Sequence, residues 1–231
     1  MEETKQVLSK IVFDKFRQCI ESHTGIYIDD SKKNSFKINM DTRMRILGIK
    51  DYDAYYSFIT TNARGKKEFD ELLNLILIKE TFFFRDDRQL NVLTKNILPE
   101  LIERKKEKEI KIWSAGCATA EEPYSIAMAI MESHLPDDIN VSIYATDISG
   151  GALKRAKEGI YNKSSMRAID KAMVNKYFTQ RDGRYFLGDQ VKRRVRFETV
   201  NLIEPYFPTE GESIDIIFCK NVLIYFRIET V

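Results

Sequence analysis

The sequence predicts an α/β protein in which a small all-helical domain, residues 1–80, precedes a domain built on a parallel sheet, residues 81–231. Before residue 80, apolar residues recur at three- and four-residue steps, as on one face of a helix. After residue 110, short apolar runs alternate with helical segments, which is typical of strands buried in a parallel sheet. The first such run ends in small residues, and two acids, a proline and a helical pattern follow it.

The N-terminal part is predicted to be a bundle of four helices. Their expected ranges are 7–20, 38–47, 53–59 and 68–79, with a break at His23–Gly25 after the first. Between residues 32 and 50 there is one acid and a group of six basic residues: Lys32, Lys33, Lys37, Arg43, Arg45 and Lys50. These cations form either a solvated helix face or a docking surface for an acidic partner.

Residues 86–105 are predicted to form a long helix with a kink at Pro99. The second domain then follows with strands at 110–115, 140–146 and 214–219 and helices at 123–133 and 150–158. Residues 176–200 are predicted to form a hairpin with its turn at Gly188-Asp189, which makes a small antiparallel β-subdomain. Because a doubly wound sheet normally continues beyond three parallel strands, we expect C-terminal strands to be missing from this chain.

Composition excludes several classes of protein. The chain is 43% hydrophobic and 31% charged with a formal net charge of +2, so nothing indicates a nucleic-acid partner. Its three cysteines, Cys19, Cys117 and Cys219, are far apart, which suits a reducing cytosol rather than a disulfide framework or a zinc site. The N-terminus is polar, and the longest apolar run is too short to span a bilayer. We therefore expect a cytoplasmic chain with no metal and no inserted membrane segment.

The loop after the first strand of the second domain has the composition of a ligand site. Small residues let a backbone approach a ligand closely, and they are followed here by Glu121 and Glu122 without a phosphate-binding lysine. This combination favours a ligand with hydroxyls and positive charge over a triphosphate. The alternative is structural, since Thr119 and Glu122 have capping-box spacing and Pro123 is tolerated in a first helical turn.

Other candidate residues follow predicted strands or precede the sheet. Asp147 ends the second strand and is either a ribose ligand or the N-cap of the next helix. Arg85 follows three phenylalanines that mark a bend, and it is either an anion clamp or part of a surface ion pair. The pairs Asn201-Leu202 and Lys220-Asn221 follow strands, where ligands of open α/β sheets bind.

Six blocks of the sequence, in order and rough spacing, resemble the CheR-type chemotaxis receptor methyltransferases. They lie at 81–85, 113–125, 145–147, 159–161, 200–202 and 217–226. The resemblance implies a Rossmann-like S-adenosylmethionine-dependent methyltransferase domain that carries the small β-subdomain. It also implies transfer of a methyl group from S-adenosyl-L-methionine to glutamate side chains of methyl-accepting chemotaxis receptors, with S-adenosyl-L-homocysteine as product.

The resemblance also assigns the site. Arg85 and Tyr225 would stand nearest the transferred methyl group. The residues that would line the cofactor site are Thr81, Arg85, Glu122, Asp147, Asn201, Leu202, Lys220 and Asn221. The helical domain would face the cytoplasmic helical region of the receptor, and we expect the chain to act as a monomer. The chain departs from the family pattern at Lys79, Ala120 and Lys220, where asparagine, glycine and arginine are usual.

Two other functions compete with this interpretation. A nucleic-acid methyltransferase of the amino-methylating kind would carry an Asp/Asn-Pro-Pro-aromatic motif, whereas residues 219–222 here are Cys-Lys-Asn-Val. The second alternative is a catalytically impaired or truncated module of the same fold that binds receptors or senses the cofactor. A methyltransferase that acts on glutamate would need no general base, because its acceptor carboxylate is already ionised at neutral pH.

Overall fold

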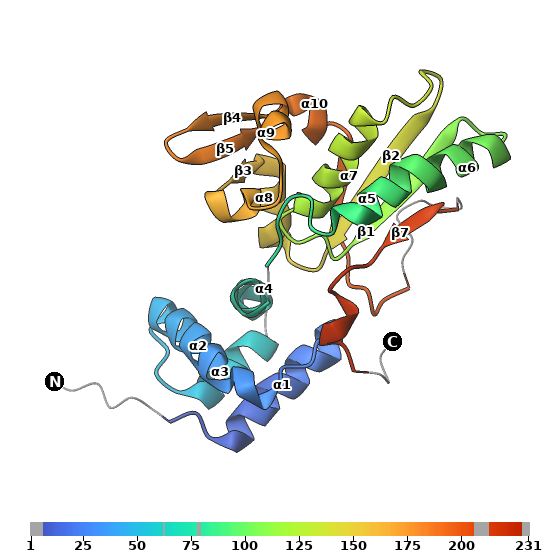
Figure 1. The fold of residues 1–231 in the computed structure, drawn as a ribbon. Coiled ribbons are helices and arrows are strands. Elements are labelled where there is room, and N and C mark those ends of the chain that lie inside the picture. The colour runs from blue at the N-terminus through green and yellow to red at the C-terminus, as the bar shows by residue number, and fades with distance from the viewer. Residues whose placement is uncertain (1–6, 62, 78–79, 206–212, 228–231) are drawn as a thin grey trace. The chain divides into compact units, whose positions relative to one another are not determined.

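The computed structural model describes residues 7–61, 63–77, 80–205 and 213–227 (Figure 1). The chain divides into two compact units, residues 1–78 with 221–231, and residues 79–220. Each unit has its own cluster of buried hydrophobic side chains. Lys79 and the predicted end of the fourth helix lie outside the described residues.

The first unit contains the four predicted helices. They are α1 (Lys10–Thr24), α2 (Lys33–Leu47), α3 (Tyr52–Thr61) and α4 (Ala63–Ile76), with the short helix η1 (Asp30–Lys32) before α2. The break predicted after the first helix is confirmed, because Gly25 ends α1 with a φ of 74°. Helices α2 and α4 begin at Lys33 and Ala63, earlier than the apolar pattern predicted, because their first turns are mostly polar, although Phe36 and Gly65 within them are buried. A further short helix, η4 (Leu223–Tyr225), belongs to this unit.

A buried ion pair joins α2 to α4. The guanidinium of Arg43 donates two hydrogen bonds to the carboxylate of Glu68, at 2.9 and 2.6 Å, and the Tyr55 hydroxyl from α3 donates a third at 2.8 Å. Glu68 is only 5% exposed, so its charge depends on these partners. Arg43, one of the six cations of residues 32–50, therefore holds the bundle together.

The second unit begins with a helical stretch that changes its winding. Helix α5 (Asp87–Val92) continues into the π-helical turn η2 (Leu93–Ile97) and then into α6 (Leu98–Arg104). Pro99 has no N–H and cannot donate to the carbonyl four residues earlier. In place of the kink predicted at Pro99, the helix has a π-helical turn that ends at Ile97, two residues before the proline.

Four parallel strands form the main sheet, in the order β6-β2-β1-β7. They are β1 (Glu109–Ala115), β2 (Asn140–Asp147), β6 (Val195–Thr199) and β7 (Ile216–Phe218). The assignment of 195–199 to a hairpin is wrong, because β6 pairs in parallel with β2. Its alternation of buried Val195 with exposed Arg196 comes from its place at the edge of the sheet rather than from an antiparallel partner.

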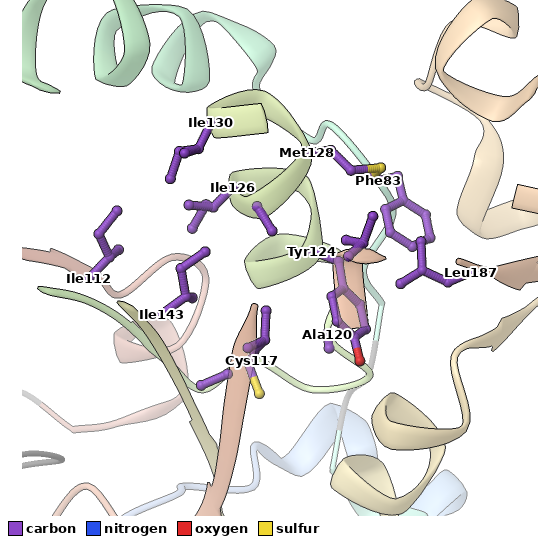
Figure 2. Close-up of a cluster of buried hydrophobic side chains, with 14 of the residues drawn as sticks. Phe83, Ile112, Cys117, Ala120, Tyr124, Ile126, Met128, Ile130, Ile143 and Leu187 are labelled. Carbon is purple, nitrogen blue, oxygen red and sulfur yellow. The ribbon is translucent and has the colours of Figure 1, made fainter. Parts of the chain in front are cut away.

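Helices α7 (Glu121–Glu132) and α8 (Gly150–Glu158) follow β1 and β2, as predicted. Figure 2 shows how α7 is enclosed: Ile126 and Ile130 lie on the side of Ile112 and Ile143, which come from the two central strands. On its other flank, Met128 lies near Phe83 and Leu187. Packing on both flanks fixes α7, and with it the turn from which the helix begins.

A small antiparallel sheet, in the order β3-β5-β4, completes the second unit. Its strands are β3 (Ile160–Tyr161), β4 (Phe178–Arg181) and β5 (Arg184–Leu187), and the short helices beside them are η3 (Lys163–Met166), α9 (Lys171–Tyr177) and α10 (Asp189–Lys192). The predicted turn at Gly188-Asp189 is wrong, because α10 begins there. The hairpin turns at Asp182-Gly183, whose φ angles of 48° and 71° suit a two-residue primed turn.

Candidate functional site

The predicted site residues of the second unit gather at one edge of the parallel sheet. Strand register pairs Ala115 with Thr146 and Asp147 with Thr199, so β1, β2 and β6 end side by side. Since parallel strands share the edge at which their carboxyl ends lie, the segments that follow them lie there too. The segments after β1 and β6 carry Glu122, Asn201 and Leu202, and Lys220 follows β7, whose last residue, Phe218, pairs with Ser114 of β1.

Asp147 joins the ends of two strands. Its Oδ2 accepts a hydrogen bond from the backbone N–H of Ala118 in the turn after β1, and its Oδ1 accepts one from Ser149, both at 2.8 Å. The N-cap alternative is wrong, because Ser149 caps α8 with its own side chain. The carboxylate thus fixes the turn of residues 116–120 against the end of β2.

Glu122 lies in the first turn of α7 and accepts a hydrogen bond from the Ser114 hydroxyl of β1 at 2.7 Å. The capping-box alternative is wrong, because the Thr119 hydroxyl bonds to Glu121 instead, at 2.6 Å, and the side chain of the N-cap Ala120 cannot cap. Burial raises the pKa of Glu122, while the Ser114 hydroxyl and the charges of Lys220 and Arg85 act against that rise. Glu122, Lys220 and Arg85 therefore form one electrostatic group.

Glu121 is more deeply buried than Glu122, at 2% exposure, and it connects three segments. Its carboxylate accepts hydrogen bonds from Thr119 and from the Ser165 hydroxyl of η3, the latter at 2.9 Å. Its backbone carbonyl accepts one from Ser125, whose Oγ in turn accepts the N–H of Phe84. Burial also raises the pKa of this carboxyl. Glu121 therefore has a structural role. Its contact with Ser165 has no signal in the sequence, because the two residues are 44 positions apart and meet only in the folded chain.

Arg85 lies in a bent segment held against α7 and η3. Its guanidinium donates to the backbone carbonyl of Glu80 at 3.2 Å and lies 5.6 Å from the ring centroid of Phe82. Its own carbonyl accepts a hydrogen bond from the Lys220 ammonium at 3.1 Å. The bend that the three phenylalanines predicted is confirmed, because Phe84 has a φ of 55°. Thr81 is part of the same segment, and its role stays a prediction.

Asn201 and Leu202 follow β6 and are half-buried. The backbone of this segment is tied to β2, since the N–H of Val200 donates to the Asp147 carbonyl at 3.1 Å.

Asn221 and Tyr225 belong to the first unit, where the Tyr225 carbonyl accepts a hydrogen bond from the backbone N–H of Tyr27. The expected pairing of Tyr225 with Arg85 at the methyl group therefore stays a prediction.

Strained backbone is concentrated in the two segments that carry these residues. Ala118 and Ala120 in the turn after β1 have φ angles of 49° and 71°, and Phe84 and Asp86 on either side of Arg85 have 55° and 57°. Positive φ is unfavourable for residues with a Cβ, and such residues collect where function requires an unusual backbone. The strain supports the assignment of both segments to one site.

Replacing Ala120 with glycine should stabilise the second unit. Removing the Cβ from a left-handed residue relieves about 1–2 kcal/mol, against about 0.8 kcal/mol for the lost burial of one methyl group. Chemical denaturation should show a net gain of up to about 1 kcal/mol for A120G. The matched control is Ala127, equally buried but within α7, where glycine should destabilise by about 1 kcal/mol or more. A loss of stability in A120G would contradict the strain argument.

Two family models match the chain. The model described as "CheR methyltransferase, all-alpha domain" matches residues 11–77, and "CheR methyltransferase, SAM binding domain" matches residues 79–230. The chain belongs to the CheR methyltransferase family. This membership makes it an S-adenosyl-L-methionine-dependent methyltransferase, as the sequence resemblance implied.

Similar proteins carry names consistent with this family. Chemotaxis protein methyltransferase 2 of Vibrio cholerae is 32% identical over 223 residues, which cover 95% of this chain and 77% of that protein. A chemotaxis protein methyltransferase of Borreliella burgdorferi is 34% identical over 233 residues, or 98% of this chain and 80% of that protein. Chemotaxis protein methyltransferase 1 of Pseudomonas aeruginosa is 33% identical over 223 residues, or 94% and 80%.

The described edge of the sheet fits the cofactor of a CheR methyltransferase. The carboxylates of Asp147 and Glu122 are acceptors at the end of the sheet where β1 and β2 finish, and ribose hydroxyls are donors of the kind that carboxylates bind. Both acids also favour a ligand that carries positive charge, as the sulfonium of S-adenosyl-L-methionine does. In the turn between them, Gly116, Ala118 and Ala120 carry side chains no larger than a methyl group, and Gly116 and Ala118 are partly exposed.

The described residues contain no candidate metal site and no helix that could span a membrane, and some of them line a cavity. No group of three or more histidine, cysteine, aspartate or glutamate side chains in the described part of the chain could hold a metal ion. Among the same residues, no helix is long and apolar enough to cross a bilayer. A cavity of about 380 Å³ in the helical unit is lined by side chains of both charges: Arg43, Leu47, Phe58, Arg64, Lys67, Glu68, Asp70 and Glu71.

Proposed function

We propose that this CheR methyltransferase forms methyl esters on glutamate side chains of methyl-accepting chemotaxis receptors. The observation that carries the proposal is the pair of carboxylates, Asp147 and Glu122, fixed on either side of the turn that joins β1 to α7. The names of the similar proteins support chemotaxis as the process in which the enzyme acts. A cytoplasmic location follows from the same proposal, because the acceptor region of the receptor is cytoplasmic.

In this proposal the chain's residues bind and align rather than transfer protons. When bound, S-adenosyl-L-methionine supplies a methyl group on a positively charged sulfur, and the acceptor oxygen takes that methyl group as the carbon–sulfur bond breaks. No proton is released, since the acceptor carboxylate is ionised at neutral pH. Asp147 would hold the ribose, and Glu122 with the 116–120 turn would hold the rest of the cofactor. Arg85 and Tyr225 would orient the reacting groups.

Alignment is the term on which the rate should depend. The carboxylate and the sulfonium carry opposite charges that cancel as the methyl group moves, so a fixed cation gains nothing from charge developing in the transition state. Holding the acceptor oxygen, the methyl carbon and the sulfur in line can lower the barrier by several kcal/mol, up to about 7–11 kcal/mol. The planar guanidinium of Arg85 suits this task because its fork matches a carboxylate.

We further propose that the helical unit faces the receptor. Of the six cations of residues 32–50, Arg43 is paired with buried Glu68, and Lys37 is paired with Asp41 at 2.6 Å. Lys32, Arg45 and Lys50 are exposed. Exposed cations of this kind can attract an acidic helical surface, and the attraction is screened by salt. The proposal treats the enzyme as a monomer.

The proposed reaction is tested by following tritiated methyl groups from S-adenosyl-L-methionine to a soluble fragment of receptor cytoplasmic helices. We expect label on the fragment that is released as methanol by mild base, because esters hydrolyse and methylated amines do not. A fragment whose acceptor glutamates are changed to alanine is the control and should remain unlabelled. In the same assay, rising salt should raise the KM for the fragment. Base-stable label, or none, would contradict the proposed reaction, and a salt-independent KM would contradict docking through the exposed cations.

A further inference from the structure

Arg167 is an exposed arginine whose guanidinium is held in place. It stacks on Phe82, with the guanidinium carbon 3.6 Å from the ring centroid, and its side chain remains 41% exposed. One terminal nitrogen, Nη1, donates to the Ser164 carbonyl at 3.3 Å, and the other, Nη2, donates to Oε1 of Glu80 at 3.1 Å. A free arginine side chain loses up to about 2 kcal/mol of rotamer entropy when it is ordered. Here that ordering has already occurred.

The same two residues that hold Arg167 also hold Arg85. The backbone carbonyl of Glu80 accepts a hydrogen bond from Arg85, and the ring of Phe82 has the Arg85 guanidinium 5.6 Å from its centroid. The two arginines act on neighbouring acids as well, since Arg85 opposes the raised pKa of Glu122 and Arg167 opposes that of Glu121. Arg167 is therefore a second cation beside the residue assigned to the methyl group.

The carboxylate of Glu80 is weakly held by comparison. Its side chain is 75% exposed, and ion pairs in such surroundings contribute about 0–1 kcal/mol. If Glu80 moves away, Arg167 keeps its stacking on Phe82 and its bond to Ser164, and Nη2 becomes available to another carboxylate. Exchange of one exposed carboxylate for another at Nη2 costs little, because the kind of bond is conserved.

We propose that Arg167 binds an acidic side chain of the acceptor protein, and that Glu80 occupies this position until the acceptor displaces it. The inference rests on the proposed function, because it requires an acceptor that carries carboxylates. In this account Glu80 competes with the acceptor. Arg167 sets affinity for acidic segments, while Arg85 aligns the reacting group. Removing the charge of Arg167 should therefore weaken acceptor binding, and removing the charge of Glu80 should strengthen it.

A double-mutant cycle on Arg167 and Glu80 tests the proposal, with the receptor fragment as acceptor. Loss of one charge-assisted hydrogen bond in R167A should raise the KM for the fragment about 5- to 10-fold, with a smaller change in kcat. E80Q should lower the KM about two- to fivefold, since a neutral amide competes less well. In R167A/E80Q the KM should equal that of R167A, because Glu80 acts only through Arg167. An unchanged or higher KM in E80Q, or additive effects in the double variant, would overturn the proposal.

Two further measurements separate binding from folding. R167K keeps the charge but not the stacked fork and should give a KM between wild type and R167A. S-adenosyl-L-homocysteine should bind R167A as tightly as it binds wild type, which shows that the fold and cofactor site are intact. A weakened affinity in R167A would instead assign the residue a structural role and overturn the proposal.

The matched control is the exposed pair of Arg104 and Glu100 on α6, joined at 2.6 Å with side chains 74% and 55% exposed. R104A and E100Q make the same changes of net charge and should leave the KM unchanged. An equal effect in the control pair would mean that net charge, not Arg167, sets the KM.

Failure of the proposed function can be told apart from failure of this inference. If the wild-type enzyme places no base-labile methyl group on the fragment, the proposed reaction is wrong. If wild type is active and R167A matches it in KM, only this inference is wrong.

Discussion

Replacing Asp147 with asparagine should weaken S-adenosyl-L-methionine binding about 10- to 100-fold. In the structure each carboxylate oxygen accepts one backbone N–H, from Ala118 and Ser149, and the negative charge makes both oxygens strong acceptors for a ligand hydroxyl. Asparagine removes the charge and turns one of the two oxygens into a donor that faces an N–H. Hydrogen bonds to charged groups contribute about 1.5–3 kcal/mol, and 1.4 kcal/mol corresponds to about tenfold in affinity. Isothermal titration calorimetry measures the change directly.

The control for this substitution is Asp215, which lies directly before β7, at the end of the sheet where the parallel strands begin and opposite the end that carries Asp147. Its Oδ2 accepts the backbone N–H of Lys111 at 2.8 Å, and the carboxylate pairs with Lys105 at 2.9 Å. D215N therefore also removes a carboxylate that accepts a backbone hydrogen bond. It should lower thermal stability without changing cofactor affinity. Equal losses of affinity in D147N and D215N would show that Asp147 acts through stability and not as a ligand.

Replacing Arg85 with alanine should lower kcat for methyl transfer about 100-fold, the size of loss expected when reacting groups are misaligned by about 1 Å. The bent segment should keep its shape, because Phe83 and Phe84 hold it through backbone hydrogen bonds to Ser165 and Ser125. R85K should recover only part of the rate, since an ammonium is a point charge without a planar fork. Initial rates of tritiated-methyl transfer at saturating acceptor measure both variants.

Arg88 provides the control for Arg85. It lies three residues further on, exposed in α5, and R88A removes the same charge. We expect R88A to transfer methyl groups at the wild-type rate. Transfer at the wild-type rate in R85A would exclude the assigned role of Arg85, and equal losses in R85A and R88A would attribute the effect to charge alone.

Much of the fold could be predicted because its signals are local. The strand β1, the turn after it and helix α7 follow from an apolar run, small residues and a helical pattern. Strand β6 could not be assigned correctly, because an edge strand with one exposed face alternates in the same way as a hairpin strand. The hairpin turn has a local signal, Asp182-Gly183, but Gly188-Asp189 has a similar turn composition although α10 begins there.

The positions of the candidate site residues in the fold were predictable where the residues follow strands and unpredictable where the fold brings distant segments together. Asp147 ends β2, and Glu122 lies in the helical turn that follows β1, so sequence position alone indicated where both lie in the fold. The hydrogen bonds that fix them depend on strand register and on which acid of Glu121-Glu122 turns inward. Arg167 had no such signal, because its contact with Phe82 spans more than eighty residues and forms only in the folded chain.

Nuclear magnetic resonance of the amide groups during titration with S-adenosyl-L-homocysteine tests the central claim most directly. The account places the cofactor at the carboxyl ends of β1 and β2, on the turn that Asp147 fixes. The amides of residues 116–120 and 147–149 should therefore shift most, and the Ala118 amide, which donates to Asp147, should be among them. Binding that leaves these amides unmoved and shifts another part of the chain would contradict the account.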